Sequence, residues 1–137
     1  MPRLSTQTVG SGDQSWLGSS HGINDCRTEF LDISTFTAGT HYPNGYIPSG
    51  TPVAKVGGVL VPYTSAEGTT TNAGVLAGHL FTDQQVVING TASTADFAVP
   101  VLDHGRVITA KVPVGSDGAF TAPVAAAKRI NVTTVYI

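Results

Sequence analysis

The feature that most constrains this fold is a series of short β-rich runs separated by turn residues between residues 48 and 114. The clearest pair is VAKV at residues 53–56 and VLV at residues 59–61, which flank Gly57-Gly58. Glycine accepts the positive φ of tight hairpin turns, so this pattern predicts a β-hairpin. Sixteen Gly and eight Pro in 137 residues also disfavour a helix-dominated fold.

A second hairpin is expected from residues 97–103 and 106–114, with His104-Gly105 as the two-residue turn. Asp103 can stabilise such a turn by bonding its own backbone. Pro100 and Pro113 lie within these runs, and each removes a donor from a β-ladder. We therefore expect the two strands to lie at a sheet edge or to carry bulges.

Other segments have weaker signals that complete a mainly β fold. Loose alternation predicts a half-buried strand over residues 28–36, and residues 37–49 are expected to form an ordered loop with a turn at Asn44-Gly45. Residues 86–88 are expected to form a strand that turns at Asn89-Gly90. Residues 119–129 combine an early Pro123, an alanine run and two terminal cations, which predicts one short helix. Residues 130–137 alternate and predict a closing strand.

The first 27 residues are rich in Ser, Thr, Gly and Gln, so we expect an extended arm before a β-rich domain of residues 28–137. Twenty extended residues span at most about 66 to 72 Å, enough to reach a neighbouring protein. Trp16-Leu17 and Ile23 are apolar exceptions in this arm. They are expected either to anchor a partner surface or to fold back onto the domain.

The chain has few charged residues, and this limits the kinds of partner that it can bind. Only 12% of residues are charged and the net charge is −2, so clustered cations for nucleic acid are lacking. A surface this poor in charge suggests that much of it lies against other subunits. There is no apolar run of membrane-spanning length and no signal-peptide pattern, so we expect no membrane association or export. The single Cys26 fits synthesis in a reducing cytoplasm.

No constellation of residues predicts catalysis or metal binding. Asp103-His104 is the one adjacent acid and imidazole pair, and the predicted turn accounts for it. Cys26 beside Arg27 could form a reactive thiolate, but a buried inert thiol is the simpler interpretation. The histidines lack the short offsets of structural zinc sites; they are His21, His41, His79 and His104. We expect no enzyme activity, no metal and no cofactor.

The ordered runs PSGTPVAKVGGVLVPY, AGVLAGHLF, FAVPVLDHGRVITAKVPV and RINVTTVYI resemble the lambda-D-like head decoration (capsid cement) proteins of tailed bacteriophages. The upstream GDQSWLGSSHG and THYPNGYIPSG are more similar to the long-armed members from phages of actinobacteria. The resemblance covers residues 48–137 in element order. It implies a small β-tulip or β-barrel-like domain.

The resemblance also implies a function. Such a protein is made in the bacterial cytoplasm and binds as a homotrimer to the outer surface of the expanded head, at threefold and quasi-threefold positions of the virion. Its N-terminal arms add a strand to the major capsid protein. The implied arm contacts are Leu4, Val9, Trp16, Leu17, His21 and Ile23. The implied trimer interface is Pro48, Pro52, Val59, Val61 and Tyr63.

Two other functions remain open. One is another virion component, such as a tail-tube or spike protein, which is also rich in Val, Thr and Gly. The other is a glycan-binding display domain in which exposed Trp16, Tyr42 and Tyr46 stack on sugar rings.

Overall fold

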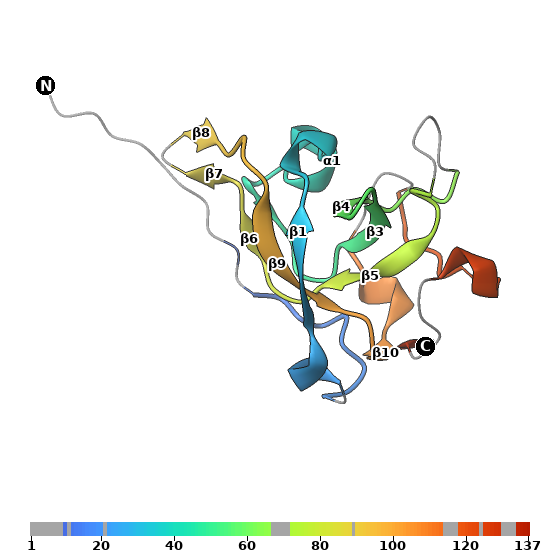
Figure 1. The fold of residues 1–137 in the computed structure, drawn as a ribbon. Coiled ribbons are helices and arrows are strands. Elements are labelled where there is room, and N and C mark those ends of the chain that lie inside the picture. The colour runs from blue at the N-terminus through green and yellow to red at the C-terminus, as the bar shows by residue number, and fades with distance from the viewer. Residues whose placement is uncertain are drawn as a thin grey trace, which may run out of the picture.

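The computed structural model describes residues 10, 12–20, 22–66, 72–88, 90–113, 118–123, 125–129 and 134–137. The chain is mainly β, with several small sheets and one short α-helix (Figure 1). The predicted mainly β class is therefore confirmed. The strands are β1 (Arg27–Leu31), β2 (Tyr46–Ile47), β3 (Pro52–Val56), β4 (Val59–Pro62), β5 (Leu76–Leu80), β6 (Gln84–Gln85), β7 (Val87–Ile88), β8 (Thr91–Ala92), β9 (Phe97–Leu102), β10 (Gly105–Val107) and β11 (Thr134–Tyr136).

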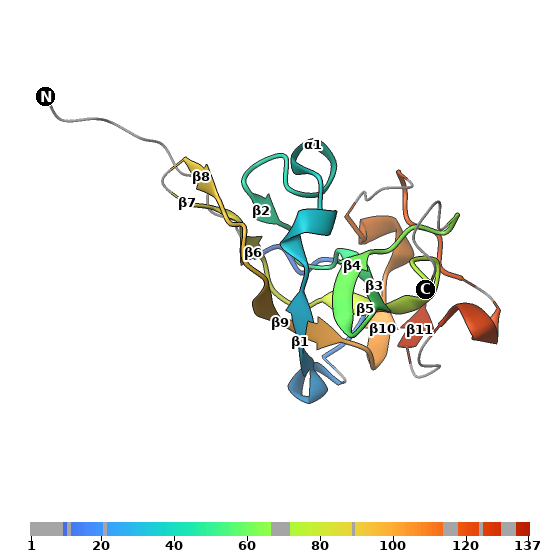
Figure 2. The same cartoon turned by 45° about the horizontal axis from the view of Figure 1, so that its top comes forward.

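Five of these strands pair in a closed ring in the order β1-β4-β3-β5-β9. Strands β3 and β4 form the hairpin predicted around Gly57-Gly58, with Val56 opposite Val59. Strand β5 pairs antiparallel with both β3 and β9, and β9 pairs along all of β1. The ring closes through one parallel pair, Leu31 and Leu60. Figures 1 and 2 show β1 and β9 side by side, with β3, β4 and β5 completing the ring.

The interior of the ring is the main hydrophobic core. Alternation along β1 directs Leu31 inward, where it is fully buried, and leaves Phe30 58% exposed. The buried members of this core are Leu31, Ile33, Phe36, Ile47, Val53, Leu60, Leu80, Val86, Val99 and Val101.

A second layer packs outside the ring, against β5 and the end of β9. Its strands are β10 and β11, which pair in parallel with Arg106 opposite Val135. Residues 12–20, hereafter the strap, lie on the other side of β10. There Gly18 N donates to Arg106 O over 2.9 Å, and Ile108 N donates to Trp16 O over 2.6 Å. We call the strap, β10 and β11 together the outer layer. Figure 2 shows β10 and β11 next to β5.

The second predicted hairpin is wrong. Strand β9 pairs with β1 and β5, and β10 pairs with β11, so residues 97–102 and 105–107 are not partners. Gly105 has a φ of 140°, but the chain uses this point to leave the ring for the outer layer. Because β9 is paired on both sides, Pro100 does not mark an edge strand, and Pro113 follows a 3-10 turn (Thr109–Lys111).

The helix expected over residues 119–129 is also wrong. Among the described residues of that segment, the helical part is a single 3-10 turn, Ala126–Lys128. The α-helix is instead α1 (Ala38–His41), within the segment predicted as an ordered loop. Its short turn is held by His41, whose Nδ1 accepts from Thr37 N over 2.8 Å. Gly45 does have the positive φ expected of the Asn44-Gly45 turn.

The remaining predicted strands are shorter than expected or are described only in part. The strand predicted over residues 28–36 ends at Leu31 and continues as a 3-10 turn (Ile33–Thr35), because the Asp32 side chain accepts from Ser34 N and caps that turn. A further 3-10 turn, Ile23–Asp25, precedes β1. The closing strand predicted over residues 130–137 includes β11, and its first part, residues 130–133, lies outside the described residues. The hairpin of β7 and β8 stands away from the ring in both views (Figures 1 and 2).

Candidate functional site

The strap packs on the body of its own chain, where Trp16 is its anchor. The Trp16 side chain is 1% exposed and belongs to a core cluster with Leu102, Val107 and Phe120. Its Nε1 donates to Ser49 Oγ over 3.0 Å, and Ser49 Oγ in turn donates to Phe81 O over 2.7 Å. Of the two interpretations of Trp16-Leu17, the structure supports folding back.

Gly50 and the carboxylate of Asp83 allow the strap to pack in this way. Gly50 has a φ of 94°, and a Cβ at that position would lie 2.6 Å from Trp16 Cδ1, so the indole lies directly over a residue without a side chain. Asp83 accepts from Ser49 N over 2.7 Å with one oxygen and from Gly12 N over 2.8 Å with the other. The carboxylate thus ties the strap to the loop before β3.

The predicted arm contacts have different locations. Leu4, Val9 and His21 lie outside the described residues. Leu17 is half-buried and bridges to Val107 of β10, and Ile23 begins a 3-10 turn. The boundary between arm and domain at residue 27 stays a prediction. Removing residues 1–27 would, however, take Trp16 out of a core cluster.

The predicted trimer-interface residues are mostly inside the chain. Pro52, Val61 and Tyr63 are buried within this one copy, whereas Pro48 and Val59 are half-buried. Val61 packs with Ala54 and Ala73 in a small third cluster, and Tyr63 packs with Phe120 at a ring-centroid distance of 6.0 Å. Their role in an interface between copies stays a prediction.

A buried histidine lies between the ring and the outer layer. His79 on β5 is fully buried, its Nδ1 lies 2.9 Å from Gly50 O, and its Nε2 lies 2.9 Å from Tyr136 Oη on β11. The carbonyl can only accept, so Nδ1 carries the proton and Nε2 accepts from the Tyr136 hydroxyl. Burial lowers the pKa of His79 to about 4, opposed by its bond to the Gly50 backbone, and burial also raises the pKa of Tyr136.

Aromatic rings enclose this histidine. Trp16 stacks on it at a centroid distance of 5.7 Å, and Phe120 meets it edge-on at 5.3 Å. The Arg129 guanidinium lies over the Tyr136 ring, 4.9 Å from its centroid. These contacts join the strap, residues 118–123 and β11 to a single side chain of the ring.

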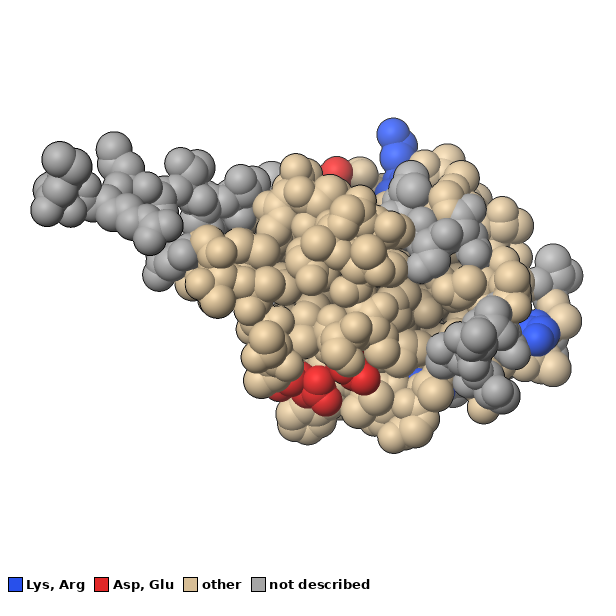
Figure 3. All heavy atoms as spheres, turned by 90° about the horizontal axis from the view of Figure 1, so that it is seen from above, with Lys and Arg blue, Asp and Glu red and all other residues tan. Residues whose placement is uncertain are grey.

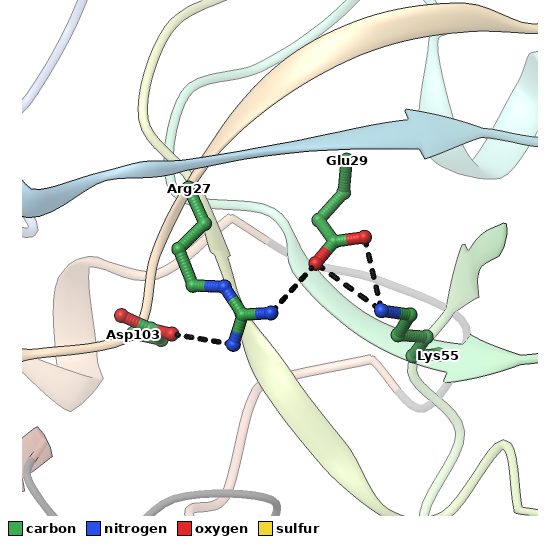
Figure 4. Close-up of polar contacts among 4 residues, drawn as sticks. All are labelled: Arg27, Glu29, Lys55 and Asp103. Carbon is green, nitrogen blue, oxygen red and sulfur yellow. Dashed lines mark hydrogen bonds and ion pairs between the residues drawn. The ribbon is translucent and has the colours of Figure 1, made fainter. Parts of the chain in front are cut away.

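A second polar arrangement lies over one end of the ring interior (Figure 4). Glu29 lies between two cations, 3.3 Å from Arg27 and 3.1 Å from Lys55, and Arg27 also lies 3.6 Å from Asp103. The four side chains come from β1, β3 and the residue after β9. With Leu60, Ala77 and Val101 they line a hollow of about 100 Å³. The two positive and two negative charges neutralise one another, so these side chains can cover this end of the core without leaving an unpaired charge there.

The acid and imidazole pair of the sequence, Asp103-His104, does not line this hollow together, since Asp103 lines it but the neighbouring His104 does not. No group of three or more His, Cys, Asp or Glu side chains among the described residues is placed to hold a metal ion. Within the same residues, no helix is long and apolar enough to cross a membrane.

Comparison of the chain with protein-family models, curated proteins and solved structures finds no match.

The surface is the remaining candidate for function. Figure 3 shows a face on which charged side chains occupy a small part of the described surface. Four large apolar side chains of the described residues are exposed to about half or more. Phe30 lies on β1 and Ile88 on β7, while Val135 and Ile137 lie in and after β11. Exposed apolar groups thus lie on β1, on β7 and at the C-terminal strand β11.

Sequence reasoning missed the residues that dock the strap. Ser49 and Asp83 are 34 residues apart, and no local pattern links them. The sequence did contain one signal for His79, which lies in the apolar run AGVLAGHLF. A histidine within such a run has to be buried with partners for both ring nitrogens.

Proposed function

We propose that this chain is a decoration (cement) protein of a tailed-phage head, which binds as a homotrimer to the outside of the expanded shell. The ordered resemblance of residues 48–137 to that family carries the proposal. The mainly β fold and the charge-poor surface are compatible with it. The trimeric state, the β-tulip fold and the major capsid protein as partner all belong to the proposal.

The surface gives a physical reason for assembly. Exposed charges keep a small monomer soluble, and this chain has few of them. Exposed Phe30, Ile88 and Val135 add apolar area to a neutral surface. Contact with other copies and with a shell would remove this area from water.

Under this proposal, the segment that reaches the capsid comprises residues 1–9, which include Leu4 and Val9. The buried position of Trp16 supports this shorter arm, because a side chain held in its own core is not free to anchor a partner. Nine extended residues span about 30 Å. Ordering one such segment costs free energy, but three arms on one trimer bind at high effective concentration.

A protein that binds only the expanded shell stabilises that state by its difference in affinity. The role is mechanical, and it requires no cofactor.

The test uses purified heads that lack their decoration protein. The full chain should cosediment with expanded heads and not with unexpanded ones, and it should saturate at three copies for each occupied position. A chain that begins at Gly10 keeps the strap and should fold, but it should bind at least tenfold more weakly. Absence of binding by the full chain would refute the function, while equal binding by both chains would refute the arm.

A further inference from the structure

We propose that His79 and Tyr136 form an acid-opened latch that holds the outer layer on the ring. The inference concerns the chain by itself and does not depend on the proposed function. Its first ground is position. His79 is a side chain of β5 that touches the strap through Trp16 and β11 through Tyr136, and these are two of the three segments of the outer layer.

The second ground is hydrogen-bond geometry. The neutral imidazole of His79 satisfies both partners, because Nδ1 donates to Gly50 O and Nε2 accepts from Tyr136 Oη. A protonated imidazole has two donors, so the Tyr136 hydroxyl would have to change from donating to His79 to accepting from it. The hydroxyl hydrogen of Tyr136 would then need a new acceptor within an apolar cluster. Protonation therefore reverses this bond and places a positive charge in a buried site, and both changes weaken the contact that closes the outer layer.

The third ground is the charge around the His79 imidazole. The strap contributes the indole of Trp16, and residues 48–51 contribute the Gly50 carbonyl. Residues 118–123 contribute Phe120, and β11 contributes the neutral phenol of Tyr136.

Two more titratable or charged groups lie just beyond these. Tyr63 contacts Phe120, and Arg129 lies over the Tyr136 ring. Among these groups there is a cation and no carboxylate, so none of the described groups that face His79 compensates a positive imidazole. The depressed pKa of His79 has the same cause, burial.

A fall in pH should favour the open state. In the closed state His79 stays neutral down to about pH 4. When opening exposes the imidazole to water, its pKa returns to the ordinary value of 6.5. Between these values the open state binds a proton that the closed state does not. The opening equilibrium constant should therefore rise by up to tenfold for each pH unit lost, and by about 100-fold between pH 7 and pH 4. Opening would expose Trp16, Phe120 and Tyr136.

The test is native-state hydrogen exchange between pH 7 and pH 4, corrected for the intrinsic exchange rate. The outer-layer reporters are the amides of Gly18, Ile108 and Ile137, which donate to Arg106, Trp16 and Val107. The ring reporters are Asp32 and Tyr63, which donate to Leu60 and Pro52. We expect the outer-layer amides to exchange through an opening that costs less than the one exposing the ring amides. Their opening constant should follow the predicted pH slope.

Two variants separate the latch from general acid unfolding. His79→Gln can donate to Gly50 O and accept from Tyr136, but it does not titrate, so the slope should disappear from the outer-layer amides. His41→Gln removes the other buried histidine of the described residues, whose pKa burial also lowers, and should leave the slope in place. An unchanged slope in His79→Gln would overturn the latch. Equal opening free energies for both sets of amides at every pH would also overturn it. If His79→Gln does not fold, Tyr136→Phe serves instead and should make the outer-layer amides exchange faster at pH 7.

Discussion

The indole of Trp16 donates a hydrogen bond of 3.0 Å to the hydroxyl of Ser49, across 33 residues of chain. This contact joins the strap to the loop before β3 and places the chain's one tryptophan in a core cluster. The described residues of the strap are thereby part of the folded domain.

Trp16→Ala should lower the free energy of unfolding by about 3 to 5 kcal/mol, since it leaves a large cavity between the ring and the outer layer. Urea unfolding followed by far-UV circular dichroism measures this without relying on the lost fluorophore. Phe30→Ala is the matched control, because Phe30 is 58% exposed. Its effect should stay within about 0.5 kcal/mol. Equal stability of the two variants would show that the strap does not belong to the core.

Asp83→Asn should destabilise the strap by about 1 to 3 kcal/mol. The carboxylate accepts from both Gly12 N and Ser49 N, whereas an amide offers one oxygen and leaves one of these donors unpaired. Limited proteolysis within residues 12–20 should become faster in this variant. The exposed Asp96→Asn provides the control and should be cleaved at the wild-type rate.

Gly78→Ala should cost more than about 2 kcal/mol in the free energy of unfolding. A Cβ on Gly78 would lie 2.7 Å from Leu102 O and 2.8 Å from Val101 Cγ1, so β5 and β9 would have to separate. Gly39→Ala in α1 is the matched substitution, since a Cβ there meets nothing within 4 Å. It should be neutral or slightly stabilising. Thermal unfolding of both variants measures the difference, and similar melting temperatures would contradict the closed ring.

Glu29→Gln should cost about 1 kcal/mol or less. Its two cations are exposed enough to turn toward water, with Lys55 at 35% and Arg27 at 59% side-chain exposure. The loss should shrink in 1 M salt, because screening weakens the pairs in the wild-type chain. A loss that is larger in 1 M salt than in dilute buffer would mean that charge is not what Glu29 contributes.

These features differ in how far the sequence could predict them. The β3–β4 hairpin was predictable because Gly57-Gly58 and two apolar runs lie within nine residues of one another. The pairing of β9 was not, since His104-Gly105 has the composition of a hairpin turn. Its partners β1 and β5 are supplied by distant parts of the chain. The helix expected at residues 119–129 failed for a related reason. Arg129 bonds Pro123 O and Thr134 O, which commits that segment to contacts with β11.

The candidate site was predictable only in part. A lone Trp-Leu pair in a polar segment signals an anchor, but the sequence does not say whether the anchored surface is the chain's own. That choice depends on Gly50, which leaves space for the indole, and on Ser49, which accepts its N–H. Both residues looked like ordinary turn residues in the sequence.

The central proposal is attachment to a phage head, and electron cryomicroscopy of expanded heads incubated with this protein tests it most directly. The account predicts one trimeric density at each occupied threefold or quasi-threefold position of the outer surface, with a β-rich body that fits residues 10–137. Heads without added density, or density located on the tail, would contradict it.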